Sequence, residues 1–192
     1  MRRLEATKLL VGHLHNEPVV SNLGPTSDEL WHTKHRDRNF YTHGSMGLCS
    51  SIALGIALVT PERVISLDGD GSLLMNMGTL ATIARERPRN LIVVVWDNEQ
   101  WGQTGHQPSH TAKGTDLEQV ARGCGIPKHA TVRTLEDLDS VFQQALHEDG
   151  PWLIVAKIEE AEYLPHGPVE PEATAYRFRS TFLASQGSAS KR

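Results

Sequence analysis

The sequence lacks the long apolar run that a membrane span needs and the basic pattern that is typical of nucleic-acid-binding proteins. No stretch approaches the roughly 18 apolar residues of a membrane span, and no apolar core of a signal peptide follows Met1-Arg2-Arg3. The formal net charge is −4, and no stripe of lysine and arginine alternates with aromatic residues. These absences argue against nucleic acid and membranes as partners, and we expect a cytoplasmic protein.

Cysteine is also scarce, since Cys49 and Cys124 are the only two in 192 residues. They lie far apart, without the short spacing of a metal site, in apolar or glycine-rich surroundings that suit small buried side chains. Two thiolates are too few for an iron–sulfur cluster with four cysteine ligands in one chain. The sequence therefore predicts structural cysteines and disfavours a ferredoxin-linked oxidoreductase.

What the sequence does contain is the composition and pattern of an α/β domain. Hydrophobic residues make up 39% and charged residues 22%, which suits a folded domain with a substantial core. Short β-branched runs alternate with longer helical patterns, as in the βαβ units of a parallel sheet. We predict one domain over residues 1–165, with a mostly parallel sheet flanked by helices on both faces. Residues 166–192 are predicted to form a tail that is poorly ordered at its end.

Periodicity and the glycine and proline signals give the expected elements. Strands are expected at residues 18–22, 63–67, 91–96, 129–132 and 152–158. Helices are expected at residues 3–14, 26–30, 46–59, 72–85, 116–122 and 135–147. The stretch 98–114 has no periodicity, so we predict a long loop at the carboxyl end of a strand that serves as a lid.

Polar residues follow two successive predicted strands. Gly69-Asp70-Gly71-Ser72 comes directly after one strand and Asp97-Asn98 directly after the next. The carboxyl ends of parallel strands face the same crevice, so the Asp70 carboxylate and the Asn98 amide oxygen are expected to meet there. Such oxygen donors suit Mg²⁺, which usually completes its shell with phosphate oxygens and water. The sequence therefore predicts a magnesium site beside a diphosphate.

The Gly69-Asp70-Gly71-Ser72 turn also suits an anion. Gly69 and Gly71 allow the backbone to approach a phosphate closely, and free N–H groups at the start of a helix from Ser72 favour negative charge. The Ser72 hydroxyl is expected to add a hydrogen bond. The alternative is a plain strand-end turn with an aspartate cap, and the presence of Asp97-Asn98 on the next strand argues against it.

Gly69-Asp70-Gly71, with Asn98 27 positions after Gly71, resembles the signature of thiamine diphosphate enzymes. The resemblance implies that Asp70, Asn98 and the backbone carbonyl of Gln100 hold the Mg²⁺ that bridges the cofactor's diphosphate. It also implies that Gly44-Ser45-Met46 contacts the cofactor between its rings, where Met46 supports a bent conformation. Core packing is the alternative role for Met46.

More closely, Asn39-Phe40-Tyr41, the run 69–78 and Asp97-Asn98-Glu99 resemble the thiamine-dependent decarboxylases of sulfopyruvate and phosphonopyruvate. In the sulfopyruvate type the pyrimidine-binding and diphosphate-binding domains are separate chains, and this sequence has the length of the diphosphate half alone. The resemblance implies that a small anionic 2-oxoacid is converted to CO₂ and an aldehyde. It further implies a hetero-oligomer with a pyrimidine-binding, α-type subunit that supplies the activating glutamate.

Three histidines, His43, His106 and His110, lie in or beside the segments expected to form the crevice. Histidine titrates near neutral pH, so each is a candidate for proton transfer or for binding the substrate's anionic group. His106 replaces the second glycine that such decarboxylases carry after Gly105, which leaves the substrate open.

Two other functions remain open at this point. The chain is alternatively a subunit of a thiamine-dependent carboligase, since the same cofactor chemistry serves carbon–carbon bond formation. A different class of function is a non-catalytic subunit that retains Asp70 and Asn98 and binds the cofactor without turnover.

Overall fold

The computed structural model describes residues 1–159 and 164–189, the last six of these for their backbone only. At its centre is a six-stranded sheet in the order β2-β1-β3-β4-β8-β7, and each neighbouring pair is parallel. The strands are β1 (Val19–Ser21), β2 (Asn39–Tyr41), β3 (Val64–Gly69), β4 (Leu91–Asp97), β7 (Lys128–Val132) and β8 (Trp152–Lys157). The predicted parallel α/β fold is confirmed.

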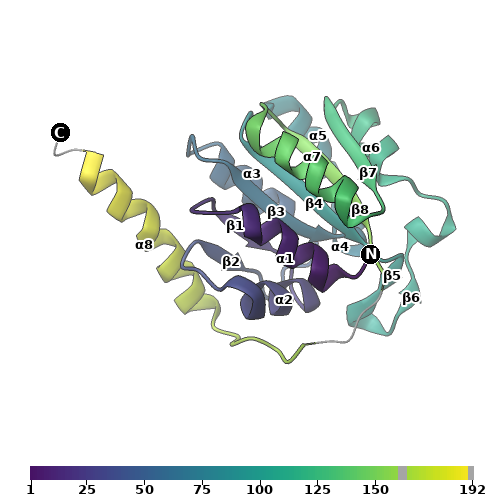
Figure 1. Cartoon of the computed structure of the whole chain (residues 1–192), viewed down its shortest axis with the longest axis horizontal. Helices are drawn as coiled ribbons and strands as arrows, with labels where there is room; N and C mark the ends of the chain where they lie inside the picture. The colour runs from purple at the N-terminus through teal and green to yellow at the C-terminus, as the bar shows by residue number, and fades with distance from the viewer. Residues whose placement is uncertain (160–163, 190–192) are drawn as a thin grey trace.

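Helices cover both faces of this sheet (Figure 1). The near face of Figure 1 carries α1 (Arg3–His13), α2 (Pro25–Lys34) and α7 (Leu135–His147). The far face carries α3 (Cys49–Ala57), α4 (Asp70–Met75), α5 (Gly78–Glu86) and α6 (Leu117–Cys124). Strand β4 contributes alternate residues to the two buried clusters, with Ile92, Val94 and Trp96 in one and Leu91, Val93 and Val95 in the other. This division follows from the two-residue period of a strand that is buried on both faces.

Two peripheral parts complete the described chain. After β4 the chain forms a small antiparallel hairpin of β5 (Gln100–Trp101) and β6 (Gln107–Pro108), with one-turn helices η1 (Gly102–Thr104) and η2 (His110–Lys113). Helix α8 (Pro171–Ala189) starts beside β2, where Phe178 packs on Phe40 with ring centroids 5.4 Å apart. From there it extends beyond the edge of the sheet (Figure 1).

The structure differs from the sequence prediction around the glycine-rich turn. The single helix predicted at residues 72–85 is two helices, because the helical conformation is interrupted at Asn76. The side-chain amide of Asn76 donates to the carbonyl of Gly47 at 3.0 Å. The helix predicted from residue 46 begins at Cys49 instead. Gly44 and Gly47 have positive φ values of 63° and 89°, which keep this segment as a loop.

The chain also contains elements that the sequence did not predict. Strand β2 is only three residues long, too short for a periodic pattern, and α8 falls in the predicted tail. Poor order was expected at the end of that tail, Gln186 to Arg192, but residues 186–189 belong to α8. Residues 190–192 lie outside the described residues.

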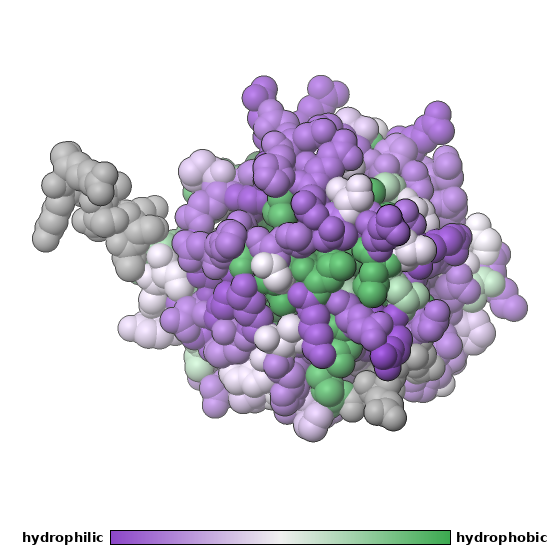
Figure 2. Space-filling model, in the orientation of Figure 1, coloured by the Kyte–Doolittle hydropathy of each residue, from purple (hydrophilic) through white to green (hydrophobic). Residues whose placement is uncertain are grey.

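The face drawn in Figure 2 is mostly hydrophilic, and apolar side chains reach its surface chiefly near the centre. Among the described residues, no helix combines the length and the apolar character that crossing a bilayer requires.

The buried cluster under α1 and α7 should tolerate truncation poorly. Phe142 is fully buried in it, so Phe142→Ala should lower the free energy of unfolding by about 3–5 kcal/mol through lost burial and a residual cavity. Urea unfolding followed by circular dichroism measures the change. Tyr176→Ala, at a side chain that is 76% exposed, is the matched control and should change the same free energy by less than about 0.5 kcal/mol. Equal stability of the Phe142 variant and the wild type would contradict this assignment of the core.

Candidate functional site

A cavity at the carboxyl edge of the sheet gathers the residues predicted to hold a metal and a diphosphate. It is lined by Met46, Gly69, Asp70, Gly71, Ser72, Asn98 and Gln100, among others. The cause is the register of two parallel strands, which pairs Gly69 of β3 with Trp96 of β4. Asp70 and Asp97 therefore lie at the same level of the sheet, at the carboxyl ends of two adjacent strands, and Asn98 is the next residue after Asp97.

Asp70 is a buried carboxylate held by two hydroxyl groups. It is 2% exposed, and its Oδ2 accepts hydrogen bonds from Ser109 Oγ at 2.5 Å and from Thr111 Oγ1 at 3.1 Å. Burial raises the pKa of Asp70 to about 6 despite the Ser109 hydrogen bond, and the neighbouring Asp97 carboxylate adds to the rise. The folded chain thus holds a carboxylate where its negative charge is poorly compensated.

A second buried carboxylate, Asp97, shares Thr111 with Asp70. Thr111 Oγ1 lies 2.8 Å from Asp97 Oδ1, and Lys157 Nζ lies 2.8 Å from Asp97 Oδ2. Ser109 and Thr111 make four short oxygen–oxygen contacts, but two hydroxyls carry only two protons. The cluster therefore has more acceptors than donors, and a cation beside Asp70 would compensate the deficit.

The turn after β4 keeps two further oxygen-bearing residues at the cavity. Asn98 is half-buried and its Oδ1 accepts from the backbone N–H of Gln100 at 3.2 Å. Between them, Glu99 has a left-handed φ of 62°, and its N–H donates to Asp97 Oδ1 at 3.1 Å. This tight turn brings Asn98 and Gln100 to the same cavity wall, beside Asp70.

Gly71 is required by a close approach of Trp101. A Cβ atom at position 71 would lie 2.7 Å from Cε3 of the Trp101 ring, a distance that a side chain cannot occupy without displacing the ring. Trp101 belongs to the β5–β6 hairpin and lines the cavity together with Gln103 and Thr104. The first part of the segment 98–114, which was predicted as a lid, thus forms a wall of the site next to the glycine turn.

The hydroxyl of Ser72 serves the protein scaffold, which differs from its predicted role. Ser72 Oγ accepts from the N–H of Gly47 at 3.0 Å, and the same hydroxyl hydrogen-bonds the buried Asp68 carboxylate. Its one proton and one of its two lone pairs are therefore used without a ligand. The helix expected from Ser72 is also only six residues long and starts at Asp70, so the peptide dipole behind the turn is small.

A second cavity, of about 400 Å³, adjoins the first and shares Leu23 and Gln103 with it. His43 and Gly44 line this second cavity, whereas Met46 lines the first, so the loop 43–47 passes between the two. The Ser45 hydroxyl donates to the backbone carbonyl of His43 at 3.1 Å. Of the three candidate histidines, the structure places His43 at a cavity.

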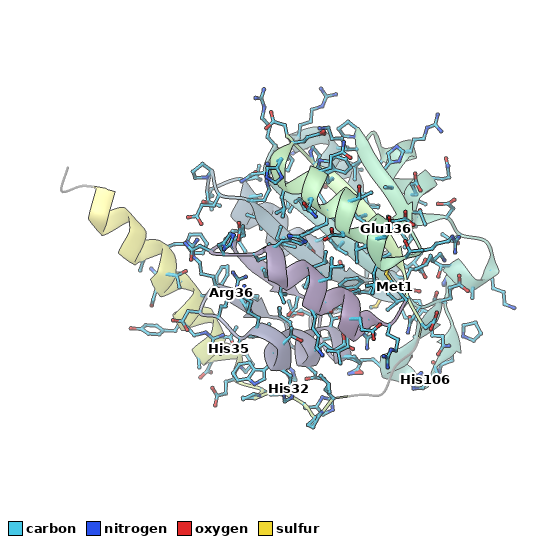
Figure 3. All side chains as sticks on the ribbon, in the orientation of Figure 1. Met1, His32, His35, Arg36, His106 and Glu136 are labelled. Atoms are coloured by element: carbon cyan, nitrogen blue, oxygen red, sulfur yellow. The ribbon has the colours of Figure 1, made fainter. Side chains whose placement is uncertain are left out.

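The other two candidate histidines lie on the lid segment. His106 is exposed at a left-handed φ of 61° on the connection between β5 and β6 (Figure 3). His110 is exposed, and its ring lies edge-on to Trp101 with centroids 6.1 Å apart. Neither is among the residues that line the two cavities.

Several residues of the site were missed by the sequence reasoning. The β1–α2 connection lines the first cavity through Asn22, Leu23, Pro25 and Thr26, although Gly24-Pro25 was read only as a turn. The Oδ1 atom of Asn22 is buried without a hydrogen-bond partner, which leaves polar capacity at this wall. Arg3 of α1 also lines the cavity, and its guanidinium group pairs with the Glu29 carboxylate at 3.0 Å.

Comparison with known proteins gives a family match over most of the chain. Residues 26–156 match the sequence model described as "Thiamine pyrophosphate enzyme, C-terminal TPP binding domain". Sulfopyruvate decarboxylase subunit beta of Methanocaldococcus jannaschii is 44% identical over 96% of this chain and 98% of its own. Phosphonopyruvate decarboxylase of Streptomyces hygroscopicus is 40% identical over 84% of this chain but only 40% of its own.

A solved structure supports the fold. The thiamine diphosphate-dependent 4-hydroxybenzoylformate decarboxylase of Rhodococcus jostii RHA1 superposes with a TM-score of 0.72 at 23% identity, over 83% of this chain and 33% of that one. The similarity in architecture thus extends well beyond the similarity in sequence.

The hydroxyl between the two carboxylates should contribute to stability. Thr111→Val removes the donor that lies between Asp70 and Asp97, so the free energy of unfolding should fall by about 1–3 kcal/mol as buried acceptors lose a partner. Thr82→Val is the matched control, because Thr82 is exposed and its hydroxyl donates to the carbonyl of Gly78 in the same helix. Urea denaturation of both variants tests this, and a Thr111 variant as stable as the Thr82 variant would refute the role of the hydroxyl.

Proposed function

The chain belongs to the thiamine pyrophosphate enzymes, as their C-terminal TPP-binding domain, and from this premise we propose that it is the cofactor-binding subunit of a split decarboxylase. Its partner is a separate α-type subunit that binds the pyrimidine and supplies the activating glutamate. The substrate is a small anionic 2-oxoacid such as sulfopyruvate or phosphonopyruvate, and the products are CO₂ and an aldehyde.

The observation that carries this proposal is a difference in coverage between two relatives. The chain covers 98% of a protein named as a β subunit but 40% of a decarboxylase that is a longer chain. The longer enzyme therefore contains domains that have no counterpart here. The match along nearly the whole of a protein named as a subunit supports a hetero-oligomer as the working enzyme.

The residues at the first cavity fit a magnesium-bound diphosphate. We assign the metal to the Asp70 carboxylate, the Asn98 amide oxygen and the backbone carbonyl of Gln100, because oxygen donors from one carboxylate and neutral groups suit Mg²⁺. The acceptor-rich cluster of Asp70, Ser109 and Thr111 supports a cation at this point. Gly69 and Gly71 give the phosphates a backbone approach, and Ser72 acts indirectly, by fixing Gly47.

The thiazolium ring of the cofactor supplies the electron sink for the bond that breaks when CO₂ leaves. The chain's own residues position this group and shield it. Met46 lines the cavity as an apolar support, and the Gly44–Ser45 backbone would contact the bound cofactor between its rings. Trp101 covers the glycine turn and restricts water there.

We assign proton transfer and binding of the substrate's anionic group first to His43. It lines the cavity that adjoins the metal site, so a ring nitrogen can exchange a proton with a bound 2-oxoacid. His106 and His110 are second candidates, which require the hairpin to fold inward over the cavity mouth.

In this proposal the domain spans residues 1–165, and residues 166–192 form a C-terminal tail. Helix α8 of this tail packs against the edge strand β2.

Both cysteines are unpaired, which supports a reducing, cytoplasmic location.

Loss of a proposed metal ligand should abolish metal-dependent cofactor binding. Asp70→Ala or Asn98→Ala should weaken Mg²⁺-dependent thiamine diphosphate binding by more than about a hundredfold, because the site has few protein donors. Isothermal calorimetry on the assembled complex gives the dissociation constants. Asp149→Ala, which removes an exposed carboxylate, should bind like wild type, and unchanged affinity in the Asp70 variant would show that the metal lies elsewhere.

The activity itself is tested by reconstitution. The chain should release no CO₂ alone and should release it from sulfopyruvate or phosphonopyruvate when co-purified with its α-type partner. Product analysis separates the alternatives, because a free aldehyde indicates a decarboxylase and a longer ligated product indicates a carboligase. A stable, cofactor-loaded complex without turnover of any 2-oxoacid would overturn the proposal in favour of a non-catalytic subunit.

A further inference from the structure

The chain reaches α8 through a segment without helix or strand. This segment comprises residues 164–170, and we call it the strap. The strap runs past α2 to the first residue of α8 (Figure 1). It lies outside residues 26–156, which match the family model. The strap is therefore an addition to the domain that this model describes.

Three hydrogen bonds attach the strap to α2. His32 Nε2 lies 3.0 Å from the carbonyl oxygen of Pro165. His166 Nδ1 lies 3.0 Å from Asp28 Oδ2, and the N–H of Gly167 donates to Asp28 Oδ1 at 3.0 Å. Within the described parts of the chain, no backbone–backbone hydrogen bond joins the strap to α2 or to the sheet. Side chains of α2 therefore hold the strap in place.

Asp28 is the central residue of this attachment. It is 7% exposed, and each of its two carboxylate oxygens contacts the strap. A buried carboxylate that lacks hydrogen bonds is costly, so Asp28 favours the strap in the position that the structure shows. Asp28 thus acts as a latch for the strap.

Gly167 allows the strap to lie against Trp31. A Cβ atom at position 167 would lie 3.0 Å from Cγ and 3.3 Å from Cβ of Trp31. These distances are shorter than ordinary van der Waals contact, so a side chain at this position would push the strap away from α2. The close approach of Gly167 therefore supports the same position of the strap as the Asp28 hydrogen bonds.

The strap closes one side of the second cavity. Residues 166–170 line this cavity without interruption. Asp28 and Trp31 line it from α2, and His43 lines it from the loop that precedes α3. Displacement of the strap would therefore open the cavity to water on this side.

We propose that the strap is the wall that closes the substrate pocket, and that Asp28 is the positioning residue that holds it there. This inference rests on the proposed function, which places the 2-oxoacid beside His43. With the strap in place, hydrogen bonds compensate the negative charge of Asp28 where an anionic substrate enters. With the strap displaced, the pocket would lose a wall and expose a bare carboxylate that repels the substrate.

Asp28→Ala tests the latch in the complex with the α-type subunit. Hydrogen exchange of the strap amides, that of Gly167 above all, should become at least about tenfold faster by mass spectrometry. KM for sulfopyruvate or phosphonopyruvate should rise at least about tenfold while kcat changes less than about threefold, because the wall binds substrate and transition state alike. A purely structural role would instead lower kcat through loss of folded enzyme and leave KM unchanged.

Asp37→Ala is the matched control. The Asp37 carboxylate is 71% exposed and lies 3.6 Å from Arg177 of α8, so it also contacts the C-terminal region. It lines neither the first nor the second cavity. This variant should leave exchange of the strap unchanged and KM within about twofold of the wild type.

Gly167→Ala displaces the strap by a second route and leaves Asp28 in place. Exchange of the strap amides should again become faster, and KM should rise at least about threefold. If Asp28→Ala does not fold by circular dichroism, the Gly167 variant decides by the same two measurements.

The outcomes separate this inference from the proposed function. A wild-type complex that converts no 2-oxoacid would overturn the proposed function. Unchanged exchange of the strap in Asp28→Ala would overturn the latch while the proposed function stands. Faster exchange of the strap with an unchanged KM would show that the strap is held by Asp28 but is no wall of the substrate pocket.

Discussion

The site depends on the parallel register that pairs Gly69 of β3 with Trp96 of β4. Because both strands end at the same edge, the residues that follow each of them are neighbours in space although they are far apart in the chain. The register is fixed by burial on both faces, since a slip by one residue would move every side chain of β4 to the opposite cluster. Core packing on the two faces of the sheet therefore sets the distance between Asp70 and Asn98.

The same register concentrates negative charge in a buried place. Two carboxylates, Asp70 and Asp97, share the hydroxyl of Thr111, and the one lysine that contacts this pair among the described residues, Lys157, lies on the Asp97 side. The protein thus pairs the Asp97 carboxylate with a cation and gives the Asp70 carboxylate only neutral donors. That asymmetry suits a metal site, because the uncompensated carboxylate is the one beside the glycine turn.

Around this centre, separate segments of the chain enclose the first cavity. The glycine turn, the β1–α2 connection and the β5–β6 hairpin form three walls of the first cavity. The loop 43–47 separates it from the second cavity, and the hydrogen bond from the N–H of Gly47 to Ser72 Oγ ties this loop to the glycine turn.

The sequence alone predicted the fold class, most of the strands and helices, and a set of glycine and polar residues that the first cavity gathers. These follow from local patterns, since two-residue and 3.6-residue periods mark the elements and Gly69-Asp70-Gly71 and Asn98 stand directly after strands. Only the tertiary structure decided the rest. Separate segments bring four further residues to the site, namely Ser109, Thr111, Lys157 and Asn22. The Ser72 hydroxyl binds the N–H of Gly47, which is free to donate because α3 starts later than its pattern indicated. Such contacts depend on where packed helices and strand order place distant segments, which no local period in the sequence records.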